Sequence, residues 1–188
     1  MFIQTEPTPN PATLKFLPGR EVSPEATLDF TDPEEAARLS PLARRIFDVG
    51  GVVGVHLGSD FVSVTKSETE DWYLLKPAVL GAIMEHYLSG EPTVAPEALE
   101  ARRSAEAPSD DEDETIRAIR ELIDSRVRPV VARDGGDIVF HGFERGIVYL
   151  HLRGACSGCP SAVVTLKNGI ENLLKYYVPE VVEVRAVS

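Results

Sequence analysis

Apolar and polar residues follow two repeating patterns along this chain, one typical of strands and one typical of helices. Four stretches in the first half alternate or cluster apolar residues as half-buried strands do: residues 13–16, 26–30, 52–57 and 61–66. Pro18-Gly19 supplies a turn between the first two. Gly58 to Asp60 joins the last two, so we expect a β-hairpin over residues 52–66.

Two helical segments are predicted in the same half. Asp32-Pro33 favours a helix start and Gly50-Gly51 a stop, with Ser40-Pro41 expected to split or restart the helix. The apolar residues between them recur at helical spacing: Leu39, Leu42, Ile46 and Val49. A later helix has an apolar face of Trp72, Leu75, Val79, Ile83 and Tyr87, with Pro77 near its start or at a kink.

The second half has the same mixture of elements but no residue-level repeat of the first. A helix is expected over residues 116–127, capped by Asp113 or a neighbouring acid and closed by Pro129. A turn at residues 134–137 leads to a second hairpin. The remaining elements are predicted as strands over residues 138–143 and 147–152, a helix over 161–177 and a strand over 181–187.

Residues 96–114 differ in composition from both halves. They hold few large apolar residues and carry 8 acids against 2 bases, compared with 14 against 7 in residues 1–95 and 8 against 10 in residues 115–188. A solvated helix is possible for residues 97–103, but residues 108–114 have nothing to bury. We expect the α+β fold class, with two small α+β domains, 1–95 and 115–188, joined by an acidic flexible linker, 96–114.

Composition and charge exclude several functional classes. The net charge of −11 argues against a general affinity for nucleic acid or anionic membranes, because phosphate binding depends on clustered Lys and Arg. No stretch approaches the ~20 consecutive apolar residues of a membrane span. Residues 1–10 lack the layout of a signal or transit peptide, so we expect a cytoplasmic protein, or a processed form in the mitochondrial matrix.

Cys156 and Cys159 are the only cysteines, and they are too close together to form the disulfide framework of a secreted domain. They lie between a predicted strand and a predicted helix that starts near Pro160. Unpaired N–H groups and the helix dipole favour anions at such a position, so we expect a lowered thiolate pKa. Gly154 and Gly158 would let both sulfurs point the same way.

A Cys-x-x-Cys pair by itself fits several kinds of site. It suits an iron–sulfur cluster, half of a zinc site, a redox dithiol or two buried core cysteines. The surrounding loop is rich in Gly and Pro, which argues against core cysteines. A thioredoxin-like dithiol fits less well, because the 74 residues after the linker hold too few strands for that fold.

The histidines add little to this pair. His141 and His151 could complete a zinc site, but both lie in predicted strands and are more simply surface or packing residues. His56 and His86 belong to the first domain and have no cysteine neighbours in the sequence.

The number of thiols predicts a dimer. Zinc and a four-iron, four-sulfur (4Fe–4S) cluster each take about four thiolates, and this chain has two. The simplest complete site joins two chains about a twofold axis, each giving Cys156 and Cys159. A cluster held between subunits would be released when the dimer separates or when a partner's thiolates compete, which suits transfer.

Longer motifs resemble the NifU/Nfu family and cover nearly the whole chain. The second domain carries the likeness in Arg128-Pro129, Asp134-Gly-Gly-Asp137, Gly154-Ala-Cys-Ser-Gly-Cys-Pro-Ser161, Thr165-Leu-Lys-Asn-Gly-Ile-Glu171 and Pro179-Glu180. The first ninety residues are similar to the Nfu N-terminal domain in Thr8-Pro-Asn-Pro11, Leu14-Lys-Phe16, Ser40-Pro-Leu42, Gly58-Ser-Asp-Phe61, Val64-Thr-Lys66, Trp72 and Leu75-Lys-Pro77.

The resemblance implies an iron–sulfur cluster assembly or carrier protein that is not an enzyme. It implies that Cys156 and Cys159 of a homodimer bind a 4Fe–4S cluster as its iron ligands. An upstream cluster donor would load the cluster, and apo iron–sulfur recipient proteins would accept it. This sequence does not contain the cysteine-rich scaffold and ferredoxin-like regions of the longer nitrogen-fixation NifU proteins, which favours carriage over direct construction.

Two further hypotheses concern the surroundings of the cysteines. The first domain has no cysteine and no metal-like spacing of histidines, so we expect it to dock partners; the alternative is a stabilising module. Arg153 would offset the negative charge of the thiolates, although a solvated arginine at a strand end is the simpler interpretation.

Overall fold

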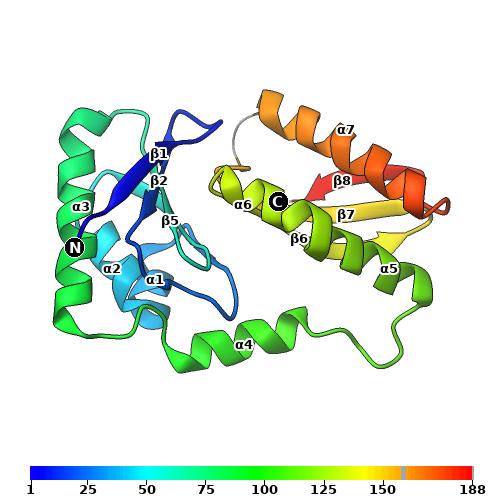
Figure 1. The fold of residues 1–188 in the computed structure, drawn as a ribbon, viewed down its shortest axis with the longest axis horizontal. Helices are drawn as coiled ribbons and strands as arrows, with labels where there is room; N and C mark the ends of the chain where they lie inside the picture. The colour runs from blue at the N-terminus through cyan, green and yellow to red at the C-terminus, as the bar shows by residue number, and fades with distance from the viewer. Residues whose placement is uncertain (158–159, 188) are drawn as a thin grey trace.

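The chain forms two α+β domains side by side, with the helix α4 between them (Figure 1). The computed structural model describes residues 1–157 and 160–187, without the side chains of residues 161 and 162. Each domain has one sheet and one apolar core, and the two cores are separate clusters of buried side chains. Among the described residues, no helix has both the length and the apolar character that crossing a membrane requires.

The N-terminal domain is a five-stranded antiparallel sheet with helices on one side. Its strands run in the order β1-β2-β5-β4-β3, so the predicted hairpin of β4 and β5 is confirmed and lies between β2 and β3. The elements are β1 Gln4–Pro7, β2 Thr13–Leu17, β3 Leu28–Phe30, α1 Pro33–Leu39, α2 Pro41–Phe47, β4 Val52–Leu57, β5 Val62–Lys66 and α3 Trp72–Ser89.

The two faces of this sheet differ in chemistry because successive strand residues point to opposite sides. Phe16, Leu57 and Val64 belong to the apolar core that the sheet shares with residues of α1, α2 and α3. Lys15 and Ser63 alternate with these residues and so face away from the helices, and each donates a hydrogen bond to a backbone carbonyl of the C-terminal domain. The sheet therefore offers an apolar face to its own helices and a polar face to the second domain.

Local sequence signals explain how the helices of this domain start. The Asp32 side chain accepts a hydrogen bond from the Glu34 N–H at the start of α1. The Ser40 hydroxyl does the same for the Ala43 N–H, and Pro41 begins α2, so the predicted split at Ser40-Pro41 is confirmed. Pro77 lies within the first turns of α3.

Part of the expected linker is helical. Residues Pro96–Glu106 form α4, in which Ala98 is buried and Leu99 packs against the N-terminal core. Small and apolar side chains on one helix face explain this packing, which the acidic composition of the segment concealed. The exposed, irregular part of the connection is residues 107–111.

The C-terminal domain is a three-stranded sheet of order β6-β7-β8 with helices before and after its hairpin. β6 and β7 form the predicted antiparallel hairpin, and β8 pairs with β7 in parallel after the crossover helix α7. The elements are α5 Glu114–Leu122, the π-helix η1 Ile123–Val127, α6 Arg128–Arg133, β6 Gly136–Glu144, β7 Ile147–Gly154, α7 Pro160–Tyr177 and β8 Glu183–Val187.

One prediction about a single element was wrong, and one strand was missed. Pro129 does not close the first helix of the C-terminal domain, because it stands in the first turn of α6, where a missing N–H costs little. The π-helical turn η1, which precedes Pro129, joins α5 to α6. The strand β1 was not expected, since Gln4–Pro7 has no apolar alternation and lies at the sheet edge.

Candidate functional site: the cysteine loop

The predicted site lies in the loop between β7 and α7, which we call the cysteine loop (residues 154–159). Gly154 has a left-handed backbone with φ of 60°. The Ala155 N–H donates to the Gly135 carbonyl at 3.1 Å, and the Ser157 hydroxyl donates to the Gly154 carbonyl at 2.8 Å. Cys156 is described as a free thiol, whereas Cys159 lies outside the described residues.

Cys156 is buried, with 8% of its surface exposed, and it packs with the C-terminal core. Its sulfur lies against the backbone of Gly136: a Cβ added there would be 2.3 Å from Sγ. The expectation that loop composition keeps the pair out of the core was therefore wrong for Cys156. Gly136, at the start of β6, provides the space that the sulfur fills.

Burial also changes the acidity of this thiol in the direction opposite to the one expected. Burial first, and then the negative charges of Asp134 and Asp137, together raise the pKa of Cys156 to about 12. In this conformation Cys156 is a neutral thiol at physiological pH.

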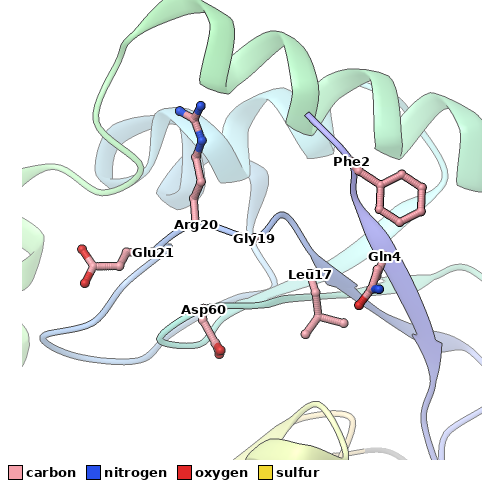
Figure 2. Close-up of a pocket in the computed structure, with 7 residues that line it drawn as sticks. All are labelled: Phe2, Gln4, Leu17, Gly19, Arg20, Glu21 and Asp60. Carbon is pink, nitrogen blue, oxygen red and sulfur yellow. The ribbon is translucent and has the colours of Figure 1, made fainter.

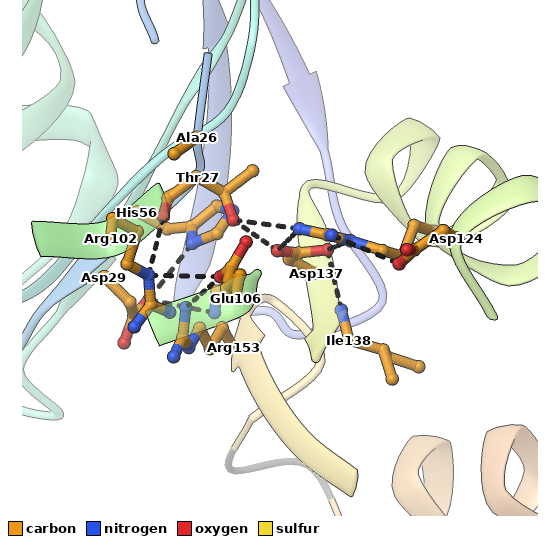
Figure 3. A network of polar contacts seen from close by, with 12 residues as sticks. Ala26, Thr27, Asp29, His56, Arg102, Glu106, Asp124, Asp137, Ile138 and Arg153 are labelled. Carbon is orange, nitrogen blue, oxygen red and sulfur yellow. Dashed lines mark hydrogen bonds and ion pairs between the residues drawn. The ribbon is translucent and has the colours of Figure 1, made fainter. Parts of the chain in front are cut away.

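Asp137 organises the region behind the cysteine loop (Figure 3). Arg128 donates to both of its carboxylate oxygens at 2.9 Å, a bidentate pairing. The N–H of Ile138 donates to the same carboxylate at 2.9 Å, and so does the hydroxyl of Thr27 from the N-terminal domain. Burial lowers the pKa of Arg128, but the hydrogen bonds and charge of Asp137 outweigh it, so the net shift is upward and Arg128 stays charged.

The polar face of the N-terminal sheet contacts the cysteine loop directly. The Gly154 N–H donates to Asp29 Oδ1 at 3.1 Å, and the Asn10 side-chain amide donates to the Ser157 carbonyl at 3.2 Å. Next to the loop, Ser63 donates to the Gly135 carbonyl at 2.6 Å, and Lys15 Nζ donates to the Arg133 carbonyl at 3.1 Å. We call these four side chains, together with Thr27, the covering face.

Arg153 is buried, with 9% of its surface exposed, so the interpretation as a solvated strand-end arginine was wrong. Its Nη1 lies 3.9 Å from Glu106 Oε1, and Arg102 Nε lies 3.2 Å from the same atom. Figure 3 shows these groups stacked beside Asp29 and His56. Glu106 thus connects the end of α4 to the strand that leads into the cysteine loop.

Among the described residues, the histidines do not gather around Cys156 as a metal site. His141 is exposed and His151 is half-buried in the C-terminal sheet, while His56 and His86 are buried in the N-terminal domain. His56 Nδ1 lies 3.2 Å from Asp29 Oδ1. In the part of the chain that the structure describes, no three His, Cys, Asp or Glu side chains are grouped as metal ligands.

A separate hollow of about 550 Å³ lies at the other end of the N-terminal sheet (Figure 2). Its lining mixes charged and apolar side chains: Phe2, Gln4, Leu17, Gly19, Arg20, Glu21 and Asp60. None of these residues belongs to the cysteine loop or the covering face. The hollow therefore adds no group to the candidate site.

Two family models match the chain. The model of the scaffold protein Nfu/NifU N terminal matches residues 3–90, and the NifU-like domain model matches residues 119–185. The whole chain is 50% identical to the human protein named NFU1 iron-sulfur cluster scaffold homolog, mitochondrial, and covers 72% of it. The chain belongs to the Nfu/NifU family.

Two insect proteins carry the same name as the human relative. Proteins of the same name from Drosophila persimilis and Drosophila virilis are each 50% identical to the whole chain, which covers 65% and 62% of them. The chain therefore spans less than two thirds of these two proteins. A solution structure of a NifU-like protein from Saccharomyces cerevisiae is 25% identical over 51% of this chain and 86% of that protein, with a TM-score of 0.46.

The sequence motifs include several residues of this Nfu/NifU site whose individual roles the sequence did not predict. The Asp134-Gly-Gly-Asp137 segment was read as a turn, yet Gly136 accommodates the cysteine sulfur and Asp137 anchors Arg128. The covering face carried one available signal, the polar residues that alternate with apolar ones in β2 and β5. What the alternation could not identify is the partner that this polar face meets.

Proposed function

We propose that this chain is a carrier of 4Fe–4S clusters, which two chains hold between them through Cys156 and Cys159 and pass to apo-proteins. The observation that carries the proposal is the Cys-x-x-Cys pair between β7 and α7 of a NifU-like domain. Relatives at 50% identity are named iron–sulfur cluster scaffolds, which supports the cargo. The proposed role is carriage by binding and release, without catalysis.

The number of donors determines the proposed assembly. A cubane cluster takes about four thiolates, and one chain offers two, so a second copy supplies the rest. Soft sulfur ligands suit iron–sulfur clusters better than they suit hard cations. A site divided between subunits opens when the dimer separates, which supports delivery rather than permanent storage.

The residues present fit this cargo if the loop moves. Cys156 Sγ points into the core beside Gly136 and is neutral there, so binding iron requires the sulfur to turn outward and lose its proton. The left-handed Gly154 precedes the cysteines and gives the loop a pivot without a side chain. The described conformation therefore corresponds to the cluster-free chain.

Anaerobic reconstitution with iron and sulfide tests the proposal. We expect a brown dimer with broad visible absorption and about four irons per two chains. Cys156→Ala and Cys159→Ala should each abolish retention of the cluster, whereas Ser157→Ala, a control in the same loop, should retain it. A colourless protein that holds zinc, or a dithiol that cycles with thiol reductants, would support the alternative chemistries instead.

The proposed partners are an upstream cluster donor and apo iron–sulfur recipients, and α3 offers a surface for a recipient. Most of its exposed positions are apolar, with Leu74 and Leu88 exposed by 71% and 81%. A helix that is apolar on all sides is usually covered by another element. Exposed Asp71 and Glu85 border this face, and the 14 acids against 7 bases of residues 1–95 disfavour a second N-terminal domain as its occupant. We therefore propose that it docks a recipient with an apolar surface edged by cations.

Transfer kinetics test docking separately from cluster binding. Leu74→Ser combined with Leu88→Ser should slow transfer to an apo-enzyme that requires a 4Fe–4S cluster, without lowering iron content. Tyr176→Ser combined with Val182→Ser removes two equally exposed apolar side chains from the C-terminal domain and serves as the control. Equal transfer rates for all three proteins would show that α3 is not the docking surface.

The compartment remains part of the proposal. The names of the relatives include the word mitochondrial, which supports the matrix among the two locations considered. Nothing in the comparisons supports the cytoplasmic expectation.

A further inference from the structure

The polar face of the N-terminal sheet is buried although it carries ionisable and hydroxyl side chains. Lys15 is 7% exposed, and Thr13, His56 and Ser63 are each 1% exposed. Lysine is almost never buried without a partner, so a face of this composition calls for a polar surface against it. The C-terminal domain supplies that surface.

The partners of the covering face are mainly backbone atoms of the cysteine loop and the turn before β6. Asp29 binds the Gly154 N–H, Asn10 binds the Ser157 carbonyl and Ser63 binds the Gly135 carbonyl. Backbone atoms present this pattern only in one loop conformation. The covering face therefore recognises the cysteine loop in the conformation that keeps Cys156 buried.

Two glycines allow this close approach. A Cβ at Gly135 would lie 2.7 Å from the Ser63 hydroxyl oxygen, and a Cβ at Gly154 would lie 3.0 Å from the His56 ring. Both glycines also have positive φ, at 77° and 60°. The contact surfaces fit because neither position carries a side chain.

The contact between the covering face and the cysteine loop can open without disrupting the core of either domain. The two apolar cores are distinct clusters, so the covering face meets the loop through hydrogen bonds rather than through a shared core. Water can replace hydrogen bonds between polar surfaces with little net change in free energy. The connection at residues 107–111 is exposed and irregular, which gives the domains a place to pivot.

We propose that the N-terminal domain covers the cysteine loop of the cluster-free chain, and that the domains separate before two chains share a cluster. This inference rests on the proposed function. In the closed form the covering face occupies the side of the loop that carries Gly154 and Ser157, and Cys156 is turned inward. A second chain reaches Cys156 only after the covering face has moved away.

Lysine labelling and amide exchange on the full-length chain test this cover. Thr27→Ala combined with Asp29→Ala removes the three hydrogen bonds that these side chains form with Asp137, Arg128 and Gly154, and it changes neither cysteine. Asp60→Ala combined with Thr69→Ala changes the same residue types at exposed positions of the same domain and is the matched control. Circular dichroism of each variant establishes that both domains remain folded.

We expect the covering-face variant to exchange the Gly154 amide about tenfold faster than the control, as the loss of one or two hydrogen bonds implies. An amine-acylating reagent should also modify Lys15 faster in that variant. Equal rates in the variant and the control, or an unprotected Gly154 amide in the unmodified chain, would overturn the closed form.

The loading step is tested on the reconstituted dimer with the same reagent. Lys15 should become reactive when the cluster binds. If Lys15 stays protected in a fully loaded dimer, the proposed separation is wrong while cluster binding stands. If no cluster binds, the proposed function fails, and the exchange data on the cluster-free chain still decide whether the covering face contacts the loop.

Discussion

At the scale of single residues, Gly136 and Cys156 depend on each other. The sulfur occupies the position that a β-carbon would take at residue 136, so this glycine is required by packing rather than by its backbone angles. The sequence signals only a Gly-Gly turn here, because a missing side chain does not indicate which atom fills the space. Local patterns thus located the cysteines but could not predict that one of them is buried.

Gly136→Ala should push the Cys156 sulfur out of its place. We expect the free energy of unfolding of the C-terminal domain to fall by about 1–3 kcal/mol, the usual cost of overpacking. Alkylation of Cys156 in the cluster-free protein should become faster, as peptide mass spectrometry can measure. Gly142→Ala is the control, because a Cβ there meets nothing within 4 Å. An equal loss of stability in both variants would contradict this packing role.

His86 gives the N-terminal domain a dependence on pH. Burial lowers its pKa from 6.5, the positive charge of Arg45 lowers it further, and Glu91 opposes them. The folded domain therefore favours neutral imidazole, and the unfolded chain takes up a proton more readily as the pH falls below 6.5. The stability that the domain gains from a neutral His86 is therefore present above pH 6.5, and it is lost as the pH falls below that value.

His86→Phe should flatten that dependence. Between about pH 7.5 and about pH 5.5 we expect a smaller fall in melting temperature than in the unmodified protein. The described structure shows no hydrogen-bond partner for either ring nitrogen of His86, so the substitution breaks none of its side-chain bonds. His141→Phe replaces an exposed histidine and should leave the fall unchanged; identical curves for the two variants would rule out His86 as the source.

At the scale of elements, helix boundaries were predicted best where a single side chain fixes them. Asp113 caps α5 as expected, and Ser40 separates α1 from α2, because each satisfies backbone N–H groups within a few residues. The helix α4 was read as linker because its buried face is small and its composition acidic. Pro129 was wrongly predicted to end a helix, because a proline is also well suited to the first turn of the next one.

Glu171 joins two elements of the C-terminal domain. Its carboxylate accepts the N–H of Val184 in β8 at 3.1 Å and the ammonium of Lys175 at 2.7 Å. The Lys175 bond and then the Val184 bond lower the pKa of Glu171. The carboxylate thereby holds the end strand of the sheet against α7.

Glu171→Ala should release the start of β8. We expect a loss of about 0.5–1.5 kcal/mol in the free energy of unfolding, the typical contribution of a hydrogen bond. Exchange of the Val184 amide should be faster, while Glu180→Ala, at an exposed position, should change neither quantity. An unchanged Val184 amide in the Glu171 variant would contradict the clamp.

At the scale of the whole molecule, separate cores predict separate responses to damage. Leu174 is fully buried in the C-terminal core, and Ile83 is fully buried in the N-terminal core. The sequence predicted the two domains from their patterns, but it contained no pattern that pairs one domain with the other. The contact between them depends on matching hydrogen bonds such as Asn10 to Ser157, which periodicity does not encode.

Leu174→Ala should lower the stability of the C-terminal domain by about 2–5 kcal/mol, as expected for a large-to-small change in a core. Ile83→Ala should do the same for the N-terminal domain. Amide exchange resolved by peptide should show each loss within its own domain and at the covering face only. Loss spread evenly over both domains would show that they unfold as one unit.

The parallel pairing of β8 with β7 has a practical consequence for anyone preparing this protein. Val187 lies opposite His151, so the chain leaves the sheet heading toward Gly154, the first residue of the loop that carries the thiols. A purification handle fused after the final residue would project beside the loop at which, in the assembly proposed above, two chains share a cluster. Handles are better attached at the other terminus, which Figure 1 shows beside α3, at the edge of the molecule away from β7 and α7.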